Sequence, residues 1–79
     1  MLYTSQIKAA RSLLGWRQQD LAKASGVGIA TIQRIEMMDG PASGNYRTVF
    51  KIQAALETAG IEFTDGDEGT VGVSFGRSA

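Results

Sequence analysis

Residues 16–36 read WRQQDLAKASGVGIATIQRIE, and this stretch decides the fold. It contains one helical pattern over residues 18–25 and the start of a second, which continues to Met38. Between them lie two glycines on either side of Val27. Gly26 can adopt a positive φ at a helix end, where other residues are strained. The stretch therefore predicts two helices, 18–25 and 29–38, joined by a tight turn in which Val27 is buried.

Helical patterns on both sides of this stretch add a first and a fourth helix. For the first, over residues 5–14, Thr4 or Ser5 can cap the start and Gly15 can end the helix. Turn-forming residues at 39–44 separate the third helix from the fourth. Apolar residues recur at helical spacing in all four helices and are expected to face the core: Ile7, Ala10, Leu13, Leu14, Leu21, Ala22, Ile32, Ile35, Met38, Val49, Ile52, Ala55, Leu56 and Ala59.

The fourth helix is followed by a change of period. Asn45 or Thr48 can cap this helix, and Gly60 can close it. Beyond Gly60 apolar residues alternate with polar or small ones, on both sides of a turn at residues 65–69. The predicted fold is mainly α: a four-helix domain over residues 1–60, then a C-terminal β-hairpin or two short strands within residues 61–79.

The predicted hairpin needs a surface to pack against, because two strands alone are marginally stable in water. One hypothesis is that its apolar side chains help to form a two-fold homodimer. The alternative is that they pack only on the helices of their own chain. The residues concerned are Ile61, Phe63, Val71, Val73 and Phe75.

Composition excludes several classes of function. The chain has 79 residues, 43% of them hydrophobic and 20% charged, as expected for one small packed domain. It has no cysteine and no histidine, so disulfides, thiol nucleophiles and Cys/His zinc sites are excluded. We expect no enzyme activity, no cofactor and no metal. No apolar run is long enough for a signal peptide or a membrane span, which predicts a cytoplasmic protein without a membrane partner.

The net charge of zero conceals an uneven distribution. Residues 1–60 carry seven basic and four acidic residues, a net charge of +3. Residues 61–79 carry one basic and four acidic residues, a net charge of −3. The basic part is suited to a polyanion, although three charges are also within the ordinary scatter of a protein surface.

The stretch 16–36 resembles the helix-turn-helix of the xenobiotic-response-element family, which includes Cro and the lambdoid phage repressors. The residues that match its pattern are Gln18, Leu21, Ala22, Gly26, Val27, Thr31, Ile32, Ile35 and Glu36. With the less specific flanks, the resemblance covers about residues 5–60. It implies a lambda-repressor-like domain that binds double-stranded DNA, usually as a dimeric repressor.

The resemblance also implies roles for individual residues. Gln33 and Arg34 would read base edges, Gln18 would hold a phosphate, and residues 45–48 would clamp the DNA backbone. Arg11 and Glu36 would form a partly buried ion pair, with an exposed pair as the alternative. The complete set of implied DNA-binding residues is Arg17, Gln18, Gln19, Gly28, Ile29, Ala30, Thr31, Gln33, Arg34, Asn45, Tyr46, Arg47 and Thr48.

Two departures from the family pattern limit what the second and third helices offer to DNA. Arg17 and Gly28 stand where the family commonly has Ser or Thr as helix caps, and Gly28 has no hydroxyl for a phosphate. Ile29 and Ala30 can make only apolar contacts, for example with thymine methyl groups. Base reading therefore falls mainly on Gln33 and Arg34, which would otherwise be solvated residues on an exposed helix face.

These observations favour a sequence-specific DNA-binding transcriptional regulator, acting as a repressor and as a homodimer on a partly palindromic site. In such a dimer the two recognition helices would lie roughly 34 Å apart, one turn of DNA. The alternative is a protein-interaction module, such as an antitoxin or adaptor, that uses the same scaffold to bind a protein partner.

Overall fold

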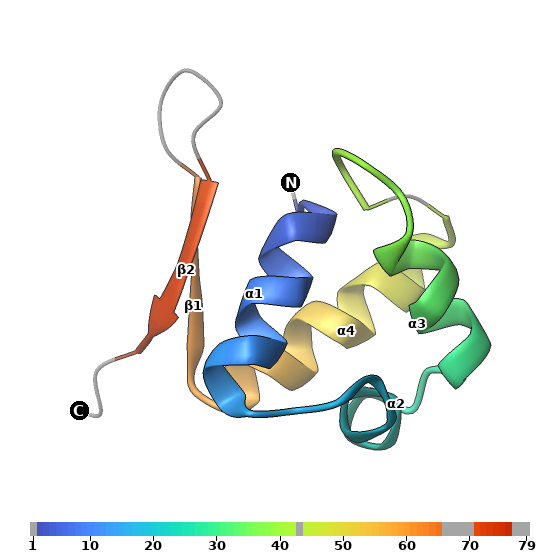
Figure 1. Ribbon diagram of the computed structural model, residues 1–79, viewed down its shortest axis with the longest axis horizontal. Coiled ribbons are helices and arrows are strands. Elements are labelled where there is room, and N and C mark those ends of the chain that lie inside the picture. The colour runs from blue at the N-terminus through green and yellow to red at the C-terminus, as the bar shows by residue number, and fades with distance from the viewer. Residues whose placement is uncertain (1, 43, 66–70, 77–79) are drawn as a thin grey trace.

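The computed structural model describes residues 2–42, 44–65 and 71–76 (Figure 1). Four helices are followed by one antiparallel hairpin, which confirms the predicted fold class. The predicted turn at residues 65–69 lies almost wholly outside the described residues. The elements are α1 Thr4–Leu14, α2 Gln18–Ser25, α3 Ile29–Glu36, α4 Tyr46–Thr58, β1 Ile61–Asp65 and β2 Val71–Phe75.

Every helix contributes to one hydrophobic core. Its largest fully buried side chains are Ile7, Leu21, Ile32, Ile35, Ile52 and Leu56, all of them predicted to face inward. Leu13 was also expected there, but this prediction is wrong, since 41% of Leu13 is exposed. Successive helical residues are about 100° apart, so Leu13 points well away from Leu14, which packs on the core.

The start of α1 corrects the predicted cap. The N-cap is Tyr3 rather than Thr4 or Ser5, and the Gln6 side-chain oxygen accepts a 2.8 Å hydrogen bond from the Tyr3 backbone N–H. Thr4 is instead buried in the first turn, where its hydroxyl donates to the Met38 carbonyl at 2.9 Å. Thr4 was available as a cap in sequence, but it is used to hold α1 against the segment that follows α3.

The end of α3 is a second correction. The helix stops at Glu36, with Met37 as its C-cap, two residues before the predicted end at Met38. The chain turns there because it crosses the start of α1, where the Thr4 N–H donates to the Gly40 carbonyl at 2.9 Å.

The cap of α4 is Asn45, one of the two residues predicted for this position. Its side-chain oxygen accepts a 2.8 Å hydrogen bond from the Arg47 N–H, and Thr48 lies inside the helix. Ala59 ends α4, and Gly60 follows with a φ of +107°, as predicted for a closing glycine.

The hairpin packs on the helices of its own chain. In Figure 1 it stands at the end of the molecule opposite α3, with β2 against α1 and β1 against α4. Ile61 is buried, and Phe63 and Val73 pack against the core. The buried Gln6 amide donates to the carbonyls of Thr64 at 3.3 Å and Gly72 at 3.0 Å, one on each strand. This contact joins both strands to α1, and sequence reasoning missed it.

The turn between α2 and α3 has the predicted form. Gly26 has a φ of +73°, and its N–H donates to the Ala22 carbonyl at 2.9 Å. Val27 is 8% exposed and belongs to the core. The Ser25 hydroxyl accepts a 3.2 Å hydrogen bond from the Val27 N–H, which fixes the buried residue in the turn.

We expect Gly26→Ala to lower the free energy of unfolding by about 1–2 kcal/mol, because a Cβ in the left-handed conformation is strained. Gly28→Ser is the control, since Gly28 has a φ of −61° and no atom within 4 Å of an added Cβ. It should be neutral, or stabilising by a few tenths of a kcal/mol through N-capping. Urea denaturation measures both, and equal effects of the two substitutions would contradict this account.

Candidate nucleic-acid interface

Three segments carry the candidate DNA-binding residues: the start of α2, the whole of α3 and the start of α4. In Figure 1, α3 lies at the far end of the molecule from the hairpin. Most of the candidates are exposed: Arg17, Gln19, Gly28, Ile29, Ala30, Gln33, Arg34, Asn45, Tyr46 and Arg47. The other three, Gln18, Thr31 and Thr48, are half-buried.

The two sides of α3 have opposite roles. Ile32 and Ile35 are at most 1% exposed, and they hold one side of the helix in the core. Gln33 and Arg34 are exposed on the other side. Neither side chain makes a hydrogen bond or an ion pair within the described part of the chain. Both side chains therefore extend into solvent from a helix that is anchored in the core, and both are available to bind a ligand.

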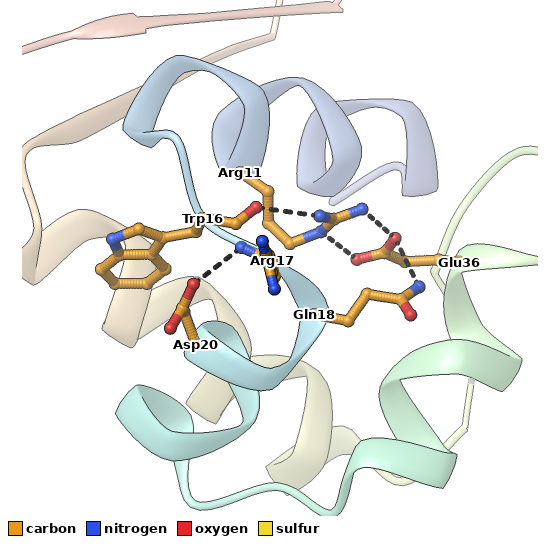
Figure 2. Close-up of polar contacts among 6 residues, drawn as sticks. All are labelled: Arg11, Trp16, Arg17, Gln18, Asp20 and Glu36. Atoms are coloured by element: carbon orange, nitrogen blue, oxygen red, sulfur yellow. Dashed lines mark hydrogen bonds and ion pairs between the residues drawn. The ribbon is translucent and has the colours of Figure 1, made fainter.

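An ion pair connects α3 to the rest of the fold (Figure 2). Arg11 donates twice to Glu36, from Nε to Oε2 and from Nη2 to Oε1, with both distances 2.7 Å. The exposed fraction of the side chain is 19% for Arg11 and 4% for Glu36. Of the two alternatives left open by the sequence, the structure therefore contains the partly buried pair. Such bidentate, charge-assisted bonds fix orientation as well as distance.

The same cluster includes the start of α2. Arg11 Nη1 donates to the Trp16 carbonyl at 3.0 Å, and Gln18 Nε2 donates to Glu36 Oε1 at 3.1 Å. Figure 2 shows the side-chain bonds from Arg11 and Gln18 meeting at Glu36, so one carboxylate links α1, α2 and α3. Gln18, expected to hold a phosphate, thus has its amide directed at Glu36. This hydrogen bond positions α2 relative to α3.

Asp20 is a residue of this region that sequence reasoning did not use. Its Oδ2 accepts a 2.8 Å hydrogen bond from the Arg17 backbone N–H (Figure 2). This bond caps α2, whose N-cap is Arg17 in place of Ser or Thr. The signal was present in the sequence, because an acidic residue at the third helical position commonly bonds the N-cap N–H.

The three exposed segments each contribute one arginine: Arg17 before α2, Arg34 in α3 and Arg47 in α4. Exposed guanidinium groups are suited to contact with a polyanion. Among the described residues, no group of His, Cys, Asp or Glu could hold a metal ion. No helix in the described part of the chain is long and apolar enough to cross a membrane.

We expect Glu36→Gln to lower the free energy of unfolding by about 3–5 kcal/mol, because it leaves the Arg11 guanidinium without its counter-charge. Glu57→Gln removes the same charge from an exposed position and should change stability by less than about 0.5 kcal/mol. Urea denaturation of both variants compares them directly. A loss in Glu36→Gln no larger than in Glu57→Gln would show that the pair does not hold α3.

Comparison with known proteins agrees with the geometry. A helix-turn-helix family model matches residues 7–59, a range that includes most of α1, all of α2 and α3, and α4 to its C-cap. No curated protein and no solved structure matches the chain. The matched residues make up more than half of the sequence and contain the glycine turn and the Arg11–Glu36 pair. The chain therefore belongs to the helix-turn-helix family, a family of DNA-binding regulators.

Proposed function

We propose that this protein is a sequence-specific regulator of transcription that reads the major groove of double-stranded DNA with α3. One observation carries the proposal: α3 is clamped on its inner side by Ile32, Ile35 and Glu36, while Gln33 and Arg34 stand exposed without partners in the described chain. A recognition helix needs this combination, because base-edge contacts demand a fixed orientation.

Within this proposal the residues of α3 read the bases. Arg34 is suited to guanine, whose O6 and N7 accept two hydrogen bonds, and Gln33 is suited to adenine. Ile29 is 36% exposed and Ala30 is exposed, so both offer apolar contact to thymine methyl groups. With two polar readers in each copy, we expect modest specificity for each half-site.

The flanking segments position the protein on the backbone. Arg17, Gln19, Tyr46 and Arg47 are exposed at the starts of α2 and α4, and we expect them to contact phosphates. Because the Asn45 side-chain oxygen caps α4, its amide N–H groups are the part left to donate to a phosphate. Thr31, Thr48 and the backbone at Gly28 would add shorter contacts.

The mode of regulation we propose is repression by occupancy, in which a homodimer covers a promoter at a partly palindromic site in the cytoplasm. Two-fold symmetry in the protein matches two-fold symmetry in such a site. The proposal requires no enzyme activity and no cofactor, since DNA binding itself blocks access.

A second candidate function, binding of a protein partner as an antitoxin or adaptor would, has one observation in its favour. Tyr46 and Phe50 lie one turn apart on α4, and 83% and 61% of these residues are exposed. Phe50 adjoins two hollows, of about 490 Å³ and 400 Å³. Large exposed aromatic residues next to hollows are typical of protein-binding surfaces.

The proposal predicts a specific loss in Arg34→Ala, once a target has been selected from random duplex DNA. Losing a bidentate base contact costs about 1–3 kcal/mol, or roughly 5-fold to 150-fold in affinity, and relaxes the preference at one base pair. Lys8→Ala removes an equal charge from an exposed site on α1 and should leave affinity unchanged. Fluorescence anisotropy measures the DNA affinity of both variants. Equal affinities of Arg34→Ala and Lys8→Ala would show that Arg34 does not contact the DNA.

Salt dependence separates the two candidate functions. For DNA binding, the logarithm of affinity should fall linearly with the logarithm of salt concentration, with a slope of about −0.9 for each phosphate contacted. Arg47→Ala should make this slope about 1 unit shallower and weaken binding to all sequences alike. Affinity for duplex DNA that does not respond to salt would contradict the proposed interface and favour a protein partner.

A further inference from the structure

We propose that β2 pairs edge to edge with β2 of a second copy of this chain, so that two hairpins form one four-stranded antiparallel sheet. The pairing deepens the homodimer of the proposed function, because it names the surface through which the two copies meet.

The backbone of β2 has an unpaired row of hydrogen-bonding groups. The hairpin register pairs Phe63 with Val73, and the Gly76 N–H donates to the Gly60 carbonyl. Hydrogen bonds in an antiparallel ladder serve alternate pairs, so the N–H and C=O groups of Val71, Val73 and Phe75 point away from β1. Within the described chain the sheet has only these two strands, so nothing pairs with this edge.

The side chains of β2 do not protect its edge from pairing with another strand. Exposed edge strands are usually protected from pairing by charged residues, proline or a bulge. The sequence of β2, VGVSF, has neither a charge nor a proline, and its register with β1 is continuous. In contrast, β1 carries Glu62 and Asp65. The uncharged edge of β2 is therefore the one suited to pairing.

The strand is complementary to itself. A two-fold axis at Val73 places Val73 opposite Val73 of the second copy, and Val71 opposite Phe75. These positions carry the outward backbone groups, so each pair can exchange two hydrogen bonds. Phe75 is 54% exposed in the single chain, and the pairing sets it beside a valine. Aromatic and β-branched residues are favourable cross-strand neighbours.

The orientation of the hairpin makes this pairing compatible with one DNA duplex. In Figure 1 the hairpin is seen edge-on, with one face toward α1 and α4 and with α3 at the opposite end of the molecule. The two-fold axis that relates antiparallel neighbouring strands is perpendicular to their sheet, so it runs from the hairpin toward the α3 end. Both α3 helices then lie at the same end of the dimer, as two half-sites on one duplex require.

The test is sedimentation equilibrium of the full chain without DNA, with circular dichroism as the check on folding. We expect the unmodified chain to dimerise and Phe75→Lys to weaken the dimer about 10-fold or more, because its aromatic contact occurs twice by symmetry. Val71→Pro should also weaken it, since it removes an outward N–H at the first residue of a strand, where proline is tolerated. If Val71→Pro unfolds the chain, the dimer affinity of Phe75→Lys alone tests the pairing.

Phe50→Lys is the matched control. It replaces an aromatic residue of similar exposure, 61%, on α4 and should leave the dimer unchanged. A dimer that is lost in Phe50→Lys and kept in Phe75→Lys would overturn the proposal in favour of the α4 surface. A chain that stays monomeric at all accessible concentrations would also overturn it.

A disulfide provides a positive test, because the chain has no cysteine of its own. The pairing sets Gly72 opposite Ser74 of the second copy as a non-hydrogen-bonded pair, with Cα atoms about 4.5 Å apart. Oxidation of the double variant Gly72→Cys/Ser74→Cys should therefore give a covalent dimer at high yield, and failure to do so counts against the register. DNA binding without dimerisation would refute this pairing and the homodimer but would leave α3 as the DNA-reading helix. A dimer that binds no duplex would refute the proposed DNA-binding function and leave the pairing standing.

Discussion

The buried ion pair between Arg11 and Glu36 is the interaction on which the arrangement of the helices depends. A helix of eight residues such as α3 is too short to be stable in water alone, so its direction must come from tertiary contacts. Ile32 and Ile35 bury one side of it, but apolar packing is not directional. The bidentate pair adds direction, and the bonds of Glu36 with Gln18 and of Arg11 with the Trp16 carbonyl extend it to α2.

This constraint decides which side chains of α3 face outward. Because the inner side of α3 is fixed in the core, Gln33 and Arg34 occupy defined positions on the outer side. The net charge of zero combines +3 in residues 1–60 with −3 in residues 61–79. Glu62 belongs to β1, and in Figure 1 the hairpin stands at the end of the molecule opposite α3.

The hairpin shows how a marginal element is stabilised. Two strands need a surface, and α1 and α4 provide one through Ile61, Phe63 and Val73. The buried amide of Gln6 adds hydrogen bonds to carbonyls of both strands, which holds them as a pair on α1. Intrachain packing thus accounts for the inner face of the sheet. The edge of β2 and the exposed Phe75 are not explained by it, and they are the features that carry the inferred contact with a second copy.

The sequence by itself determined the features that depend on neighbouring residues: four helices, the glycine turn around Val27, the α4 cap, the closing Gly60 and the hairpin. The residues that face outward on α3 also follow from helical period. Only the tertiary structure decided that Tyr3 caps α1, that α3 stops at Glu36, that Leu13 is exposed, and that Gln6 and Gln18 bond within the chain. The physical reason is distance along the chain: the partners of Thr4 and Gln6 lie 34 to 66 residues away, where local preference carries no information.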